Sequence, residues 1–278
     1  MWKNKSCFLL LVGLIYLAGC KQSPPPEIPE EEQKGAIYFS GYYWNYKNAN
    51  TPVGPGPNRF LGTSEAAWVD GNGYLHLKIF KKDNFWYCSE IISTKEFGYG
   101  TYIFTCLSDL RNFNEKNVFG FFTWNEYSFQ TDGNSEIDVE FSRWNNPNDS
   151  LLVTYSVQPV IFSNPTPYQE RTHKPSMATL AFSQATTHMM RWTPDSVYWE
   201  SYKGENYPGT TKISTWSFDN SNIPRTKILG SSVSDPIVIP APKDSTNVRF
   251  NYWLLNGQAP SNAQNYEIII KSFSYTPL

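Results

Sequence analysis

Short runs of strand-forming residues, separated by turn residues, make up this chain from Gly35 onward. Gly, Pro, Asn and Asp stand between the runs, and no window of useful length has the apolar spacing of an amphipathic helix. The runs are YLHLKIF (74–80), GTYIFTCL (100–107), LLVTYSVQ (151–158), SVYWESY (196–202), NVRFNYWLL (247–255) and YEIIIKSFSY (266–275). Many short strands and no repeat of fixed period favour a single all-β sandwich. We expect the Pro-rich stretches 48–62 and 231–246 to form loops at its rim.

The first 19 residues are typical of an export signal. Lys3 and Lys5 precede an apolar run that is too short for a comfortable membrane-spanning helix and is followed by small residues. The sequence Leu17-Ala18-Gly19-Cys20 resembles the bacterial lipobox, which implies cleavage before Cys20 and attachment of lipid to its sulfur. A plain signal peptide and an uncleaved anchor are the alternatives.

Residues 20–34 are rich in Pro and Glu and bury almost nothing, so they predict an extended tether. The folded part is then 35–278. We expect a monomer that a lipid on Cys20 holds at the bacterial cell envelope, at the outer membrane.

The composition excludes some partners and favours others. A formal net charge of -2 and a pI near 6.0 provide no basic field, which argues against nucleic acid. The 10 Trp, 18 Tyr and 18 Phe exceed what one core needs, and amphipathic rings suit a cleft that stacks on sugar rings. Strand formation in an all-β core accounts for most of these aromatic residues.

Several kinds of chemistry find no support in the sequence. It has no Gly-rich phosphate loop, no CxxC pair, no GxSxG elbow and no HExxH among its three histidines, so we expect no cofactor and no metal. Cys88 and Cys106 lie in strand-like segments joined by a turn near Phe97, and a hairpin there would place them opposite one another. A cross-strand disulfide and two buried free thiols are both open.

The segment GNSEIDVEFSRW (133–144) concentrates acidic residues. Glu136, Asp138 and Glu140 occupy every second position, so they share one face of a strand and the apolar residues between them share the other. A solvated strand face is the simplest explanation. Hydrolysis of a sugar chain, however, requires two carboxyl groups, one to protonate the departing oxygen and one to attack or to activate water.

The spacing of the row suits that chemistry on a concave sheet. The Cα atoms of Glu136 and Glu140 would be roughly 13 Å apart on a flat strand. Side chains leaning inward could bring the carboxyl groups to the roughly 5–5.5 Å of a retaining pair. Asp138 between them raises its neighbours' proton affinity when ionised and can hydrogen-bond the nucleophile.

EIDVEF resembles the ExDxE signature of glycoside hydrolase family 16 in its form without a bulge. The chain around it resembles the lichenase (β-1,3-1,4-glucanase) branch through CSEIISTKEFGYGTY (88–102), GFFTWN (120–125), HMMRWTPDSVYW (188–199) and NYWLLNG (251–257), in the family's order and at similar intervals. The resemblance covers most of 35–278. It implies a concanavalin A-like jelly-roll sandwich of two antiparallel sheets with a concave substrate cleft, and a double-displacement mechanism that retains anomeric configuration.

The resemblance also implies roles for single residues. Glu136 would be the nucleophile, Asp138 its helper and Glu140 the general acid/base. The implied sugar contacts are Asn58, Glu90, Phe122, Trp124, Asn251 and Trp253, with Gln158 as a weaker candidate. The alternatives are a surface acid for Glu90, core packing for Phe122 or Trp253, and a turn residue for Asn58.

Departures from the lichenase pattern bear on the substrate. An arginine is replaced by Ile92, a tryptophan and an aspartate by Asn134 and Ser135, and the stretch 159–187 has no clear counterpart. Such losses change which sugar fits more than whether acid/base chemistry occurs. Proteins with this fold often bind calcium, but the C-terminal aspartate that serves as its ligand has no match in this sequence, so calcium is not among our expectations.

We therefore expect a lipid-anchored, endo-acting β-glycanase that acts on β-glucan or a related glycan. The alternatives are a non-catalytic carbohydrate-binding lipoprotein on the same sandwich and a transglycosylase.

Overall fold

The computed structural model describes residues 37–110, 113–126, 135–149, 153–158, 171–175, 185–221, 226–229, 232–236 and 239–278. Regular structure within these ranges is mostly β, with a 3-10 turn at Leu255–Gly257. No helix in this part of the chain is long and apolar enough to cross a membrane. The predicted signal peptide, the lipidation site at Cys20 and the tether lie outside the described residues.

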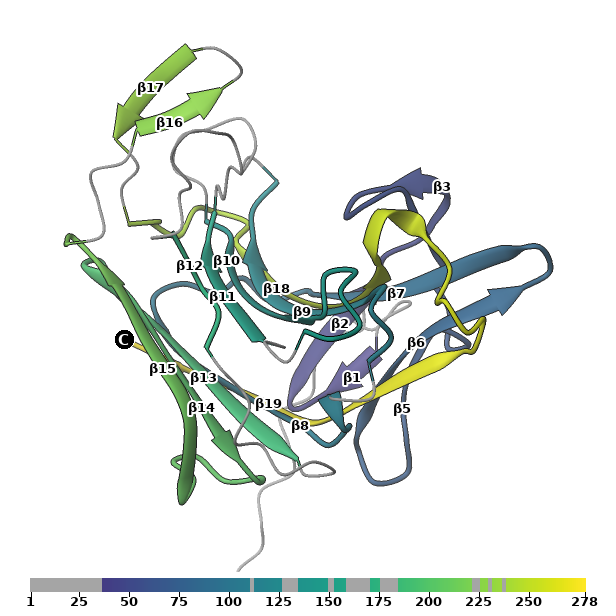
Figure 1. Cartoon of the computed structure of the whole chain (residues 1–278). Helices are drawn as coiled ribbons and strands as arrows, with labels where there is room; N and C mark the ends of the chain where they lie inside the picture. The colour runs from purple at the N-terminus through teal and green to yellow at the C-terminus, as the bar shows by residue number, and fades with distance from the viewer. Residues whose placement is uncertain are drawn as a thin grey trace, which may run out of the picture.

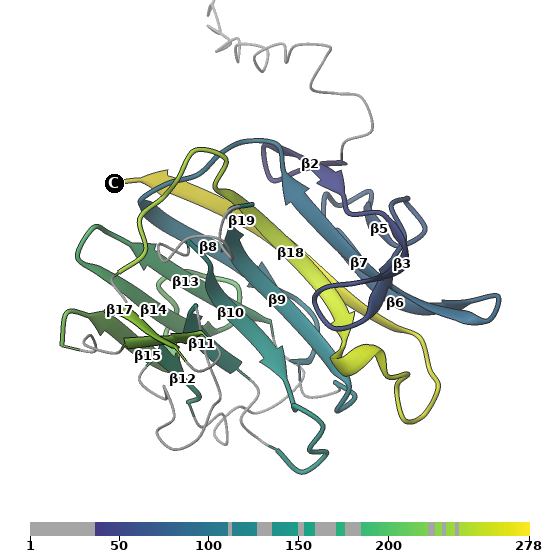
Figure 2. The ribbon, with the colours of Figure 1, turned by 90° about the horizontal axis from the view of Figure 1, so that it is seen from above.

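A concave antiparallel sheet combines strands from both ends of the chain. Its order is β1 (Ile37–Phe39), β2 (Tyr42–Tyr46), β7 (Phe85–Ser93), β18 (Asn247–Leu254), β9 (Asn117–Trp124), β10 (Ile137–Ser142), β11 (Val153–Val157) and β12 (Thr172–His173). Seen from above, β18, β9 and β10 cross the middle of this sheet (Figure 2).

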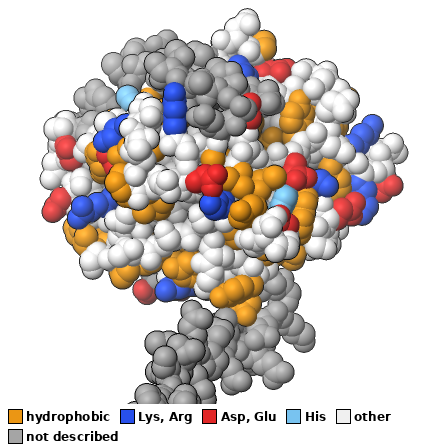
Figure 3. Space-filling model, turned by 90° about the horizontal axis from the view of Figure 1, so that it is seen from below, with side chains coloured by type: hydrophobic (Ala, Val, Ile, Leu, Met, Phe, Trp, Pro, Cys, Tyr) orange, Lys and Arg blue, Asp and Glu red, His pale blue; other side chains and the backbone are white. Residues whose placement is uncertain are grey.

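A second antiparallel sheet packs behind the first (Figure 1). Its order is β5 (Ala67–Val69), β6 (Leu75–Lys82), β19 (Tyr266–Pro277), β8 (Gly100–Cys106), β13 (Thr186–Trp192), β14 (Ser196–Lys203) and β15 (Thr211–Asp219). Its outer face mixes acidic, basic and apolar side chains (Figure 3). The predicted all-β sandwich of two antiparallel sheets is confirmed.

Two hairpins stand above the concave sheet at opposite sides (Figure 1). One contains β3 (Ala49–Val53) and β4 (Asn58–Phe60), and β4 pairs in parallel with β7. The other contains β16 (Thr226–Leu229) and β17 (Ser232–Pro236). The stretches expected to be rim loops therefore include short strands.

The core between the sheets is aromatic, and it fixes which side chains face the concave surface. Phe121 pairs in register with Val139 and Phe250, and its ring lies 5.0 Å from that of Phe250 and 4.8 Å from that of Phe104. Because side chains alternate along a strand, burying this set turns the intervening residues to the concave face. A register slip of one residue would place the carboxylate row in the core.

Cys88 and Cys106 are buried free thiols, and burial raises the pKa of each to about 12. The hairpin predicted between them is wrong, because β7 belongs to the concave sheet and β8 to the outer one. Phe97 is not a hairpin tip. Its side chain is buried in the core, where its ring centroid lies 4.9 Å from that of Tyr275. The chain therefore crosses from one sheet to the other at this point.

Candidate active site

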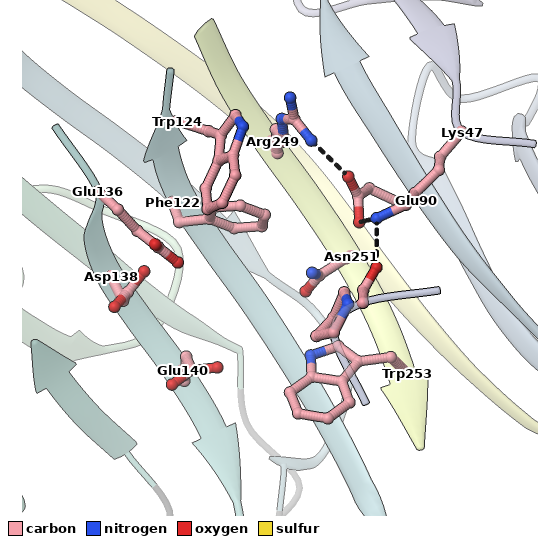
Figure 4. Close-up of a pocket in the computed structure, with 12 residues that line it drawn as sticks. Lys47, Glu90, Phe122, Trp124, Glu136, Asp138, Glu140, Arg249, Asn251 and Trp253 are labelled. Carbon is pink, nitrogen blue, oxygen red and sulfur yellow. Dashed lines mark hydrogen bonds and ion pairs between the residues drawn. The ribbon is translucent and has the colours of Figure 1, made fainter. Parts of the chain in front are cut away.

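Strand register brings residues from distant parts of the chain into rows across the concave face. One row contains Glu140, Gly120, Asn251 and Glu90, contributed by β10, β9, β18 and β7. The next contains Asp138, Phe122, Arg249 and Ile92 from the same strands. The acids of β10 therefore face a wall built from β18 and β7 (Figure 4).

These rows line a cleft of about 320 Å³. Its lining residues are Lys47, Gly54, Pro55, Glu90, Phe122, Trp124, Glu136, Asp138, Glu140, Arg249, Asn251 and Trp253. Eight of the ten residues named from the sequence are therefore brought together here, and Asn58 and Gln158 are not among the lining residues. The other four lining residues, Lys47, Gly54, Pro55 and Arg249, were not predicted from the sequence.

The carboxylate row lies deep in this cleft. Asp138 is 3% exposed, while Glu136 and Glu140 are half-buried with their carboxyl groups toward the cleft. Burial, with repulsion by Glu140, raises the pKa of Glu136 to about 8, and burial raises the pKa of Glu140 to about 7. The pKa of Asp138 is raised well above its ordinary value by burial and by both glutamates. Near neutral pH, ionised and protonated carboxyls therefore stand side by side in the row.

Two cations oppose these shifts from different positions. Arg249, on the facing wall, lowers the pKa of Glu136, and Lys174, which follows β12, lowers that of Glu140. The Arg249 side chain is only 14% exposed, whereas Lys174 is exposed. Because water and salt screen an exposed charge more, Arg249 is the better placed of the two cations. The pKa of Glu136 nevertheless stays at about 8, above the value of about 7 at Glu140.

An ion-pair cluster forms the facing wall. The Glu90 side chain is completely buried; its Oε2 accepts from Lys47 Nζ at 3.0 Å and its Oε1 from Arg249 Nη1 at 3.1 Å. Arg249 also donates from Nε to Asn247 Oδ1 at 2.8 Å. With both Glu90 oxygens engaged, this wall presents the remaining N–H donors of the two cations.

Arg249 supplies the charge whose loss was expected at position 92. Arg249 and Ile92 are register partners on neighbouring strands, so the arginine reaches Glu90 from β18 and not from β7. Its position was readable from the sequence, because Arg249, Asn251 and Trp253 alternate in one strand and must share a face. Lys47 lies between β2 and β3, outside any strand, and no periodicity identifies it.

Asn251 carries an unsatisfied acceptor at the cleft floor. It is 3% exposed, and its Oδ1 has no hydrogen-bond partner within the described residues. A Cβ on Gly120 would lie 2.5 Å from this Oδ1, so the amide occupies the space that a side chain at 120 would take. A buried acceptor without a partner is costly, and a hydroxyl donor from a ligand would satisfy it.

Aromatic rings complete the cleft. Phe122 and Trp253 are 8% and 7% exposed, and the Phe122 and Trp124 rings meet edge to face with centroids 6.4 Å apart. The Arg249 guanidinium lies 5.3 Å from the Trp124 ring centre. Phe122 and Trp253 thus pack and still contribute to the cleft surface.

The two remaining predicted sugar contacts have other partners. Asn58 is buried, and its Nδ2 donates to the carbonyls of Pro55 and Leu254 at 2.7 and 2.8 Å, which holds the loop that lines one edge of the cleft. Gln158 donates from Nε2 to Asp138 Oδ2 at 3.1 Å. Across the described ranges, no cluster of three His, Cys, Asp or Glu side chains is placed to hold a metal ion.

Several solved structures with this architecture are β-glucanases. The Bacillus licheniformis β-glucanase aligns over 88% of this chain and 94% of its own, with TM-score 0.55 and 15% identity. A laminarinase from Flavobacterium sp. UMI-01 aligns over 84% and 92%, with TM-score 0.55 and 14% identity. SCLam, a non-specific endo-β-1,3(4)-glucanase of glycoside hydrolase family 16, aligns over 91% and 93%, with TM-score 0.57 and 13% identity.

The chain has the fold of these glucanases. Its sequence matches no protein-family model and no curated protein. The glucanase fold therefore confirms the predicted jelly-roll sandwich, while the roles of single residues remain predictions from motif and geometry.

Proposed function

We propose that this protein is a retaining, endo-acting glycoside hydrolase of β-glucan. The observation that carries the proposal is the row Glu136, Asp138 and Glu140 in a cleft whose other walls offer aromatic rings and hydrogen-bond donors. Rings bind the apolar faces of sugars, and donors and acceptors bind their hydroxyls. The similar solved structures support β-glucan because their names are β-glucanase, laminarinase and endo-β-1,3(4)-glucanase.

In the proposed first half-reaction, Glu136 attacks the anomeric carbon while the Glu140 carboxyl gives its proton to the departing glycosidic oxygen. In the second, Glu140 removes a proton from water, the water oxygen attacks the same carbon, and Glu136 leaves as a carboxylate. Arg249 on the facing wall works against the raised pKa of Glu136, and the attack starts from the molecules in which Glu136 is ionised. The raised pKa of Glu140, caused by burial, favours a protonated acid near pH 7.

The test is hydrolysis of a glycan panel by the purified protein and by Glu136→Gln. We expect new reducing ends from mixed-linkage β-glucan or laminarin with the wild-type protein. In E136Q we expect turnover to fall at least about 10³-fold, because without the nucleophile the covalent intermediate cannot form. We expect the affinity for the glycan to be retained. Unchanged turnover in E136Q would refute the assignment, and binding without any cleavage by the wild-type protein would make it a carbohydrate-binding protein.

We also propose that the mature chain is a monomer anchored through lipid on Cys20, at the bacterial outer membrane. The lipobox-like sequence before Cys20 and the Pro- and Glu-rich tether after it support this. Wild-type protein should incorporate labelled fatty acid and fractionate with membranes, whereas Cys20→Ser should do neither. Equal labelling of the two proteins would exclude Cys20 as the lipidation site.

A further inference from the structure

Gln158 is bonded to two members of the carboxylate row, although it does not line the cleft. It follows β11 directly, and its backbone N–H donates to the carbonyl of Glu136 at 3.1 Å. Its side-chain Nε2 donates to Asp138 Oδ2 at 3.1 Å. The first bond extends the β10–β11 ladder beyond its last register pair, so Gln158 holds both the strand end and a side chain of the row.

A buried arginine in turn holds Gln158. Arg171 is 1% exposed; its Nε donates to the carbonyl of Val157 at 3.0 Å and its Nη2 to that of Gln158 at 2.8 Å. Its guanidinium lies 5.1 Å from the ring centre of Phe218, in β15 of the outer sheet. A planar guanidinium bonded to two successive carbonyls fixes the backbone there, because a shift would leave a buried cation unsatisfied.

The amide of Gln158 determines which oxygen of Asp138 can hold a proton. An amide N–H only donates, so Asp138 Oδ2 is an acceptor, and a proton on this carboxyl belongs on Oδ1. Figure 4 shows the Asp138 carboxyl turned toward Glu136. A protonated Asp138 is thereby prepared to donate to the Glu136 carboxylate.

Within the described residues, Gln158 is the side chain that donates a hydrogen bond to Asp138. Along its own segment, the charged neighbours of Asp138 are Glu140 in β10 and Glu136 just before β10, both of which raise its pKa. Phe122 on β9 is uncharged. Four other charged side chains lie near the row. Glu90 and Lys47 are paired with each other. Arg249 lowers the pKa of Glu136, and Lys174 lowers that of Glu140.

We propose that Gln158 is a positioning residue that assigns the Asp138 proton to Oδ1, from which it is donated to Glu136, and that Arg171 fixes Gln158 for this purpose. The role of Gln158 in catalysis rests on the proposed function. When Glu136 bonds to the anomeric carbon, the proton stays on Asp138. When that bond breaks, the electron pair returns to Glu136 and the same O–H donates to it, so Asp138 neither gains nor loses a proton.

The first test needs no turnover. Gln158→Met keeps the length of the side chain and removes its N–H donor. The pKa of Asp138 is measured by NMR on protein labelled with ¹³C at the Asp carboxyls, and the Asp138 signal is assigned by its loss in Asp138→Asn. We expect its pKa to move upward in Q158M, because a donor to the ionised carboxyl is lost. Arg171→Met should move it in the same direction by less, and the exposed control Gln264→Met should leave it unchanged. An unaltered Asp138 titration in a folded Q158M, or in Gln158→Leu if Q158M does not fold, would overturn the proposal.

Kinetics separate positioning from sugar contact. In Q158M we expect kcat to fall about tenfold, KM to stay within about twofold, and the acid limb of kcat/KM to move about one pH unit higher, because Glu136 loses a donor to its carboxylate. A raised KM with an unchanged pH profile would instead make Gln158 a sugar contact. If the wild-type protein cleaves no glycan, the proposed function fails and the carboxyl titration still decides this inference.

Discussion

Replacing Arg249 with Met should cost both stability and substrate binding. The buried Glu90 carboxylate accepts one bond from Arg249 and one from Lys47. Leaving a buried charge wholly unpaired costs about 3–5 kcal/mol, but Lys47 remains, so we expect the smaller loss of one charge-assisted hydrogen bond, about 1.5–3 kcal/mol. In a domain of this size each kcal/mol corresponds to roughly 2–4 °C. R249M should therefore melt roughly 3–12 °C below the wild-type protein, with KM raised about tenfold.

The same wall offers a rescue and a matched control. Ile92 pairs with Arg249 across β7 and β18, so the double variant R249M/I92R returns an arginine to Glu90 from β7, the strand that carries Glu90 itself. We expect it to recover most of the lost Tm in a calorimetric scan. Arg191→Met makes the same change at an exposed position of β13 and should stay within about 2 °C of wild type. If R249M melts with R191M, or if I92R restores nothing, the charge wall does not support the cleft as described.

Three further outcomes follow from the site and the core. Gly120→Ala should weaken glycan binding about tenfold, because the added Cβ displaces the Asn251 amide. The control Gly71→Ala, whose Cβ has no atom within 4 Å, should bind as the wild type does. Equal affinity in both variants would contradict the placement of the Asn251 amide at the cleft floor. Between about pH 4.5 and 8 the folded protein retains protons on Glu136 and Glu140 that the unfolded chain has released, so the free energy of unfolding should fall as pH rises. Asp138→Asn removes one of the buried acids and should melt above wild type at pH 8, but much less so at pH 4.5. A Tm that does not change with pH would contradict the raised pKa values. Cys88 and Cys106 should resist iodoacetamide in the folded protein and react after unfolding, as peptide masses can show; rapid labelling of either thiol in the native state would contradict its burial.

The strands were predictable because their signals are local. The run predicted at 266–275 is β19 (Tyr266–Pro277), and that at 196–202 is β14 (Ser196–Lys203). Alternation along 136–140 also placed the three acids on one face, since the apolar residues between them had to enter the core. Patterns of this kind depend only on neighbours in the chain.

The facing wall was harder to predict because it depends on pairing between distant segments. Ile92 indicated a lost charge, and only the β7–β18 register shows that Arg249 replaces it. The hairpin expected around Phe97 failed for a related reason. Turn residues indicate that the chain changes direction, but not whether it returns to the same sheet or crosses to the other one.

The anomeric form of the first product tests the assignment of Glu136 and Glu140 as a nucleophile and acid/base pair most directly. Proton NMR during cleavage of a mixed-linkage β-glucan oligosaccharide, recorded before mutarotation, distinguishes the two anomers. Double displacement predicts that the β anomer appears first. Initial release of the α anomer would mean a single displacement by water, and Glu136 would not be the nucleophile.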